Sequence, residues 1–296
     1  MLGSQQIDLT RTISGADINV PEVRSFGFAA FHKAIPTSDT WLAHKGPEIV
    51  YMIEGEACWE LENEALIPAS GGQFVLFPAN KLHRIVNGLY PPSYSFWIVM
   101  SGPTTTAPTL MTEDGLRDFQ EYLGCRGLTH ECEPKGLDTI RDLARLMADD
   151  RIYSGSSILI AEIRAKLHSV LIDTWKAQDR RLGERRNSDL VGDFLERLHE
   201  DPLAEITIGE LAGSLGYSRS YVHDRFRKEV GMSPNDYAQR LRIKRCCQRL
   251  VATQQSVTDI AFEFGFGSSQ YFSRVFRKYL GATPSEYRMQ MNAKGH

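Results

Sequence analysis

Polar side chains in two segments near the C-terminus are of the types that hydrogen-bond to the edges of DNA bases. An arginine such as Arg274 can donate two hydrogen bonds to guanine, and a glutamine such as Gln270 suits adenine. The polar side chains that we expect to point outward and contact bases are Arg219, Ser220, His223, Asp224, Ser269, Gln270, Ser273 and Arg274. A carboxylate near phosphates is unfavourable, so Asp224 is expected either to accept from cytosine or to orient Arg219 or Arg227.

Basic residues in the same two segments are candidates for contacts with DNA phosphates, which set register rather than sequence preference. They are Arg225, Arg227, Lys228, Arg277 and Lys278. An ordinary solvated surface is the alternative, but the distribution of charge argues against it. Residues 218–294 hold 14 Lys/Arg and 6 Asp/Glu, a net charge of +8, whereas residues 1–187 hold 19 and 24, a net charge of −5. This asymmetry predicts a DNA-binding module joined to a domain with another role.

The two segments belong to a repeat in which each copy reads as a helix, a glycine turn and a second helix. In the first copy, Thr207 and Glu210 form a capping box, and a glycine ends the first helix at residue 216. In the second copy, Ser256 and Asp259 take the capping positions and Gly265 the turn. The turn glycines and basic triplets recur in register, which an accidental repeat in a helical bundle would not produce. A duplicated helix-turn-helix with basic second helices predicts DNA binding.

The residues between the two copies are expected to form one continuous helix. Its apolar seam is Tyr237, Leu241, Cys247 and Leu250. A helix over residues 234–253 would be about 30 Å long. Because one turn of DNA spans about 34 Å, such a rod can hold two recognition helices in successive major grooves.

Residues 189–291 closely resemble the DNA-binding domain of the arabinose-regulator (AraC/XylS) family of bacterial transcription factors. The resemblance covers about a third of the chain, and its most specific positions are Ile260, Ala261, Gly265, Phe266, residues 271–278, Gly281, Pro284 and Tyr287. It implies base contacts at Ser220, His223 and Asp224. It also implies a transcription regulator that binds double-stranded promoter DNA, an activator or a repressor, with RNA polymerase as a further candidate partner.

The N-terminal half is expected to contain short β-strands followed by helices. Turn signals separate strands that we predict over residues 49–53, 57–61, 74–77, 83–86 and 95–100, as in an all-β sandwich or barrel. Helices follow from about residue 113. The apolar seam of a helix over residues 157–175 favours pairing of two such helices in a homodimer, and packing on the chain's own barrel is the alternative.

The strand segment resembles a cupin barrel, a fold whose metal-binding members hold an ion with three histidines and one glutamate. His44, Glu48 and His83 match three of those positions, and Leu42 stands at the fourth. Three interpretations stay open. The residues hold Fe(II), Zn(II) or Mn(II); or they hydrogen-bond an organic effector in a metal-free barrel, as is general in regulators of this family; or they are ordinary barrel residues. We expect the second, with no metal and no cofactor.

Aromatic residues in or beside the strands favour a small-molecule pocket, because apolar walls with a few polar groups are usual in ligand sites. The residues expected to bind the effector are His44, Glu48, His83, Trp97, Trp41, Tyr51 and Trp59. A sugar is the expected class, since many regulators of this family control carbohydrate use. Simple core packing is the alternative for the aromatic side chains.

The expected fold class is therefore α+β and multidomain. An N-terminal cupin-like β-barrel with a helical dimerisation segment precedes an all-α domain with two helix-turn-helix motifs. The expected boundaries are 1–110 for the effector-binding barrel, 111–176 for the dimerisation segment, 177–188 for a polar linker and 189–296 for the DNA-binding domain.

Other features exclude further classes of protein. No apolar run reaches the 18 residues that span a membrane, and no signal segment begins the chain, which predicts a cytoplasmic protein. Five cysteines without regular spacing argue against a disulfide framework, and Cys125, His130 and Cys132 match no standard zinc site. We expect no enzymatic activity. Two rivals stay open: a metal-dependent cupin enzyme joined to the DNA-binding domain, and a regulator of a non-sugar signal, such as an aromatic compound, a metabolite or a redox change sensed by Cys58 or Cys125.

Overall fold

The computed structural model describes residues 9–37, 40–62, 66–102, 108, 110–123, 129–182, 191, 195 and 217–294. The chain forms two compact units. The N-terminal unit comprises Met1–His32, Thr40–Arg84 and Pro92–Arg186, and the C-terminal unit comprises Lys33–Asp39, Ile85–Pro91 and Asn187–His296.

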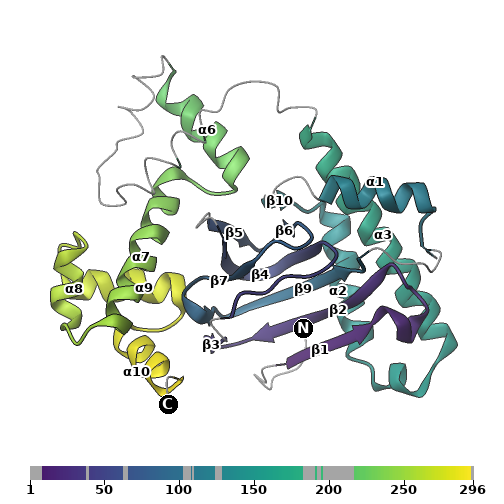
Figure 1. Ribbon diagram of the computed structural model, residues 1–296, viewed down its shortest axis with the longest axis horizontal. Helices are drawn as coiled ribbons and strands as arrows, with labels where there is room; N and C mark the ends of the chain where they lie inside the picture. Colours follow the sequence, from purple (N-terminus) through teal and green to yellow (C-terminus); the bar gives the residue numbers. More distant parts are fainter. Residues whose placement is uncertain are drawn as a thin grey trace. The chain divides into compact units, whose positions relative to one another are not determined.

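An eight-stranded sheet is the framework of the N-terminal unit (Figure 1). Its strands are β1 (Leu9–Ser14), β2 (Val23–Phe31), β4 (Glu48–Leu61), β5 (Leu66–Ser70), β6 (Gln73–Phe77), β7 (His83–Ile85), β9 (Ser93–Met100) and β10 (Thr129–Glu131). The main path runs β1-β2-β9-β4-β6-β10 with antiparallel neighbours, while β5 and β7 also pair with β4. In the described part of the chain, β1 and β10 do not pair with each other. The expected closed barrel is therefore not confirmed, and the region is a sheet.

Strand β4 differs from the sequence-based prediction of two strands separated by a turn at residues 54–56. It runs without interruption from Glu48 to Leu61. Gly55 has a φ of 79°, and the pairing with β9 shifts register between Met52 and Glu54. Residues 54–56 therefore form a bend within β4 and not a turn between two strands. The first part of β4 pairs with β9 and β6, and the second part pairs with β5.

Three helices pack on one face of this sheet (Figure 1): α1 (Glu113–Leu123), α2 (Pro134–Met147) and α3 (Ser157–Leu182). Short 3-10 helices, η1 (Gly15–Ile18) and η3 (Asp150–Ser154), connect neighbouring elements. Alternate strand residues point toward the helices and form the core with them. The strand side of this core includes Phe26, Phe28, Ile49, Tyr51, Phe74, Phe96 and Ile98.

Helix α3 departs from the sequence-based predictions in two ways. It continues to Leu182, so residues 177–182, expected as linker, are helical. The apolar seam expected to pair two copies is buried in the unit's own core, where Ile163, Leu167 and Leu171 are each 0% exposed. The seam of α3 thus packs on the sheet of its own unit, which was the alternative expectation. The sheet supplies the nearest large apolar surface.

The C-terminal unit is mainly helical. Its elements are α6 (Arg219–Val230), α7 (Pro234–Ala252), α8 (Val257–Glu263), α9 (Ser269–Leu280) and α10 (Pro284–Lys294), with the short strands β3 (Ile35–Pro36) and β8 (Leu89–Tyr90) and the turn η2 (Val86–Gly88). The long helix predicted between the two repeat copies is confirmed as α7. The predicted helix over residues 207–216 lies outside the described residues.

Two pieces from the first hundred residues belong to this C-terminal unit. Strands β3 and β8 pair with each other, and Leu89 is fully buried in the core that Ile243, Phe276 and Tyr287 help to form. The Tyr287 hydroxyl donates a hydrogen bond to the Asn87 carbonyl at 2.8 Å. Among the described helices, none combines the length and apolar character that crossing a bilayer requires.

Candidate functional sites

Helix α9 buries one face and presents polar side chains on the other. It begins after Ser268, whose hydroxyl accepts a hydrogen bond from the Tyr271 amide at 3.1 Å, and it ends at Gly281, where φ is 70°. Its buried side chains are Phe272, Phe276, Tyr279 and Leu280. Its exposed polar side chains are Gln270, Arg274, Arg277 and Lys278, with Ser269 and Ser273 half-buried. The expected DNA contacts of this copy therefore lie at solvent-facing positions.

Tyr271 lies beside these side chains and was not among the predicted contacts. It is 47% exposed, and the Arg274 guanidinium lies over its ring at 5.3 Å from the centroid. The spacing of three residues on a helix places the two side chains on one face, which is a signal already present in the sequence. The ring orients the arginine that we expect to read a base.

Helix α6 repeats this arrangement. The Ser218 hydroxyl accepts from the Tyr221 amide at 3.2 Å, and Gly231 ends the helix with a φ of 88°. Val222 and Phe226 are fully buried. Its exposed polar side chains are Arg219, Ser220, Asp224, Arg227 and Lys228, with His223 and Arg225 half-buried.

The Asp224 carboxylate pairs with a neighbour that was not predicted. Its Oδ1 lies 3.6 Å from Nδ1 of His223, rather than against Arg219 or Arg227. Asp224 is also exposed, so this contact leaves it accessible to solvent. Asp224 therefore contacts His223 here, and its two expected roles beside DNA stay predictions.

Helix α7 holds both second helices of the repeat. From α6, the Phe226 ring packs edge-on against Tyr237 with centroids 5.8 Å apart. From α9, the Tyr279 hydroxyl donates to Asp236 at 2.6 Å, and Arg240 Nε donates to the same carboxylate at 3.1 Å. The two helices are therefore fixed to one rod, which at 19 residues is about 28 Å long.

Sequence reasoning missed this network of Asp236, Arg240 and Tyr279. Arg240 is only 7% exposed, and its guanidinium lies 4.8 Å from the Tyr279 ring centroid. The spacing of four residues between Asp236 and Arg240 on one helix could be seen in the sequence. Tyr279, however, lies 43 positions after Asp236, so its contact could not be predicted from spacing.

In the N-terminal unit, His44, Glu48 and His83 come together. Glu48 Oε2 lies 3.2 Å from Nε2 of His44 and 2.9 Å from Nε2 of His83, and one ligand atom from each residue lies within 4.8 Å of the others. His83 is buried, and its Nδ1 lies 3.0 Å from the Lys81 carbonyl oxygen. Burial alone would raise the pKa of Glu48, but hydrogen bonds and charges from the two histidines lower it overall. Two imidazoles and a carboxylate in this arrangement can hydrogen-bond a polar ligand or hold a metal ion.

The predicted aromatic residues divide between the two faces of the sheet. Trp97 shares a face with Glu48, because Val50 pairs with Trp97 where Glu48 pairs with Val99. Trp59 reaches the same cluster through Phe77, whose ring stacks on His83 at 4.1 Å.

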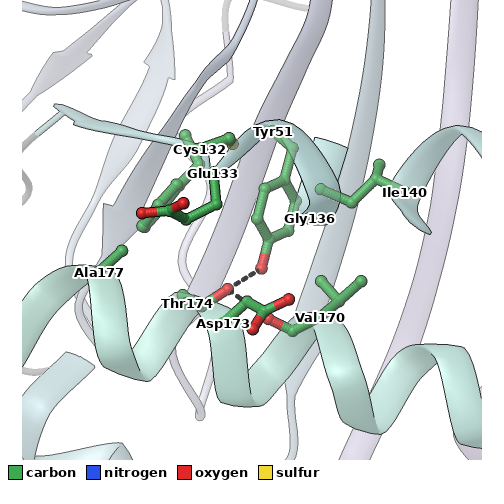
Figure 2. Close-up of a pocket in the computed structure, with 10 residues that line it drawn as sticks. Tyr51, Cys132, Glu133, Gly136, Ile140, Val170, Asp173, Thr174 and Ala177 are labelled. Carbon is green, nitrogen blue, oxygen red and sulfur yellow. Dashed lines mark hydrogen bonds between the residues drawn. The ribbon is translucent and has the colours of Figure 1, made fainter. Parts of the chain in front are cut away.

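Two predicted effector residues lie apart from this cluster. Trp41 stacks under Arg84, whose guanidinium is 4.4 Å from the ring centroid. Tyr51 faces the helices, where its hydroxyl is 2.5 Å from Thr174 Oγ1 (Figure 2). Glu48 and Tyr51 are an odd number of positions apart, so on one continuous strand they point to opposite faces. The structure therefore does not bring Tyr51 to the His44–Glu48–His83 cluster.

The cysteines considered for redox or zinc chemistry are unsuited to it where the structure describes them. Cys58 is 7% exposed, and its Sγ lies 3.8 Å from the Trp59 carbonyl oxygen. Burial raises the pKa of the Cys132 thiol to about 12, which keeps it protonated and slow to oxidise. The ring of His130 stacks on Phe74 at 4.9 Å. Cys125 lies outside the described residues.

The chain is similar to known transcription regulators. Residues 211–290 match a family model described as a helix-turn-helix domain. The transcriptional activator AarP of Providencia stuartii is 32% identical over 102 residues, which cover 34% of this chain and 76% of that protein. The Msm operon regulatory protein of Streptococcus mutans is 24% identical over 243 residues, covering 82% of this chain and 84% of that protein. A putative AraC-like regulator of Streptomyces antibioticus is 35% identical over 99 residues, covering 33% of each chain.

These similarities and the paired helices on α7 define a DNA-binding transcription regulator rather than an enzyme. The chain belongs to the AraC family of helix-turn-helix regulators.

Proposed function

We propose that this regulator reads promoter DNA with α6 and α9 in successive major grooves. The observation that carries the proposal is the repeated arrangement of a serine-capped helix with a polar outer face, fixed to the shared rod α7. The proposed base contacts are Arg219, Ser220, His223, Asp224, Ser269, Gln270, Ser273 and Arg274. The proposed phosphate contacts are Arg225, Arg227, Lys228, Arg277 and Lys278.

Selection of binding sites from random duplexes with the full-length protein tests this proposal. Arg274→Ala should cost about 1–3 kcal/mol of binding free energy and relax the preference at one base position, if Arg274 reads guanine. Lys278→Ala, on the same helix, is the matched control. It should weaken binding to all sequences alike and reduce the slope of log K against log salt by about one. An Arg274→Ala protein with unchanged affinity and site preference would remove that residue from the base-reading set.

We propose further that a small effector, with sugars as the first class to test, binds the sheet face that carries His44, Glu48 and His83. Trp59 and Trp97 supply apolar surface on that face, and Trp41 stacks on Arg84, the residue that follows His83. Hydroxyl groups suit the cluster, because they can both donate to Glu48 and accept from an imidazole. Regulation requires the effector to bind one arrangement of the chain more tightly than another.

Homodimer formation and contact with RNA polymerase complete the proposal. The boundary proposed between the two units lies beyond Leu182, because α3 continues past residue 176. The α3 seam is occupied by the unit's own core, so a dimer would use the outer face of this helix, where Ile158 is 82% exposed. Sedimentation of the wild-type protein and of Ile158→Glu tests that face. A dimer unaffected by the substitution would place the interface elsewhere.

A thermal-shift screen of sugars and metabolites, with and without EDTA, tests the effector proposal. A sugar that raises the melting temperature regardless of EDTA supports a metal-free sensor. Destabilisation by EDTA, with no response to sugars, would instead favour a metal held by His44, Glu48 and His83. The response to a sugar should be lost in Glu48→Gln if this cluster binds it.

A further inference from the structure

Two exposed tyrosines lie at the start of helix α6. Tyr217 precedes the helix and is 40% exposed, and Tyr221 lies in its first turn and is 42% exposed. Their rings stack with centroids 5.0 Å apart and with 22° between the ring planes. In the second repeat copy, the residue that follows the turn glycine is Phe266, which is only 2% exposed. The first copy therefore keeps in solvent an aromatic position that the second copy buries.

The stacked pair stands on the part of α6 that we expect to enter the major groove. Residues in the first turns of a recognition helix meet the edges of the bases. The Tyr221 amide donates to the hydroxyl of the capping residue Ser218, so Tyr221 is the third residue of the helix. Tyr221 and Asp224 are three positions apart, which makes them neighbours on the helix surface. An α6 helix that brings Asp224 to a base pair thus brings the Tyr221 ring into the same groove.

The two recognition helices differ in what lies against the tyrosine of the first turn. On α9 that residue is Tyr271, and the Arg274 guanidinium lies over its ring at 5.3 Å from the centroid. On α6 the place of Arg274 is taken by Asp224, which contacts His223 instead. The ring of Tyr221 is paired with a second aromatic ring rather than with a cation. The outer face of α9 thus offers a charged donor beside its tyrosine, whereas that of α6 offers apolar surface.

The 5-methyl group of thymine is the apolar group that base pairs present in the major groove, and apolar side chains contact it there. We propose that α6 recognises thymine, with the stacked rings of Tyr217 and Tyr221 against its 5-methyl group. Helix α9 instead reads its part of the site by hydrogen bonds from Gln270 and Arg274. This inference rests on the proposed function, because it needs α6 in the major groove.

Replacement of thymine by deoxyuridine tests the proposal, because it removes the 5-methyl group and leaves the hydrogen-bonding groups of the base pair unchanged. The probe is the duplex that binding-site selection with the full-length protein yields, with its thymines replaced one at a time. Loss of a contacted methyl group should weaken binding about fourfold, as expected for one apolar carbon withdrawn from contact. A selected duplex that binds equally well after every such replacement would overturn the proposal.

Three variants locate the contact. Tyr221→Ser removes an exposed ring and keeps a hydroxyl group, so the thymine and deoxyuridine duplexes should bind it alike. Tyr221→Phe keeps the ring and should keep the preference for thymine. Tyr271→Ser is the matched control on α9, and the ratio of the two affinities should stay as in the wild type. A preference that survives Tyr221→Ser, or one that only Tyr221→Phe or Tyr271→Ser abolishes, would show that the Tyr221 ring does not read the methyl group.

The selection step separates this inference from the proposed function. A protein that selects a specific duplex but ignores the 5-methyl groups refutes only the thymine contact. A protein that selects no duplex refutes the proposed function, and the thymine contact falls with it.

Discussion

The hydrogen bonds at Asp236 should control how firmly helix α9 is held on α7. The carboxylate accepts a short hydrogen bond from Tyr279 and a charged one from Arg240, whose side chain is 8% exposed. Hydrogen bonds to charged groups contribute about 1.5–3 kcal/mol, and leaving a buried charge without its partner costs about 3–5 kcal/mol. Since the Asp236 side chain is 27% exposed, solvent screens part of this interaction. Asp236→Asn should therefore lower the free energy that holds α9 on α7 by about 2–4 kcal/mol.

Hydrogen exchange of the full-length protein, followed by mass spectrometry of α7 and α9 peptides, measures this cost locally. A loss of about 2–4 kcal/mol corresponds to exchange that is about 30 to 1,000 times faster wherever the amides open by releasing α9. Tyr279→Phe removes one hydrogen bond and leaves the Asp236–Arg240 pair, so its effect should be smaller. Asp259→Asn is the control, because that exposed carboxylate contacts Ser256 at the start of α8 instead. Exchange in α9 that is unchanged by Asp236→Asn would refute the reasoning that this network fixes the helix.

Three further predictions concern single local features. Ser256→Ala removes the hydroxyl that accepts from the Asp259 amide at 3.0 Å, so α8 should lose about 1 kcal/mol, seen as faster amide exchange confined to its first turns. Gly265→Ala should lower the free energy of unfolding by about 1 kcal/mol. Backbone strain alone is the cause, because φ of Gly265 is 73° and nothing lies within 4 Å of the added Cβ. A melting temperature that does not fall would contradict this prediction. Because the pKa of Glu48 is lowered from its ordinary value of 4.5, ionised Glu48 stabilises the fold at pH values above 4.5, and this stability is lost as the pH falls through the folded-state pKa. Glu48→Gln should therefore be less stable than the wild type at pH 7, and the difference should shrink in acid. Urea unfolding followed by tryptophan fluorescence measures both.

The helices of the C-terminal unit were predictable because their signals are local. Ser218 and Ser268 cap α6 and α9, Gly231 and Gly281 end them, and each signal acts on amides within four positions. The apolar spacing also identified the buried seam of α7 correctly, since Tyr237, Leu241, Cys247 and Leu250 are all buried. The contact partners were not predictable in the same way, since Tyr279 meets Asp236 only after α8 and α9 have folded back on α7.

The N-terminal unit was predicted less completely, for reasons visible in particular residues. Gly55 reads as a turn, but the pairing of β4 with β9, β6 and β5 turns it into a bend inside one strand. His44, Glu48 and His83 were correctly grouped by a family motif, and the structure brings them within hydrogen-bonding distance. Tyr51 was grouped with them because of its residue type, although its odd spacing from Glu48 already placed it on the other face of a continuous strand.

In the C-terminal unit, the sequence by itself determined where the described helices begin and end and which of their faces are apolar. It also determined that a basic pair of helix-turn-helix copies follows an acidic region. Those properties depend on neighbours within a turn or two of helix and on net charge, which do not require a fold. Only the tertiary structure decided which of two partners buries the α3 seam, that β4 continues through Gly55, and that residues 85–91 join the C-terminal core. It also decided that the Tyr51 hydroxyl meets Thr174 of α3. Each of these outcomes depends on contacts between segments distant in the chain, whose stability is set by the apolar area and hydrogen bonds available once the elements meet.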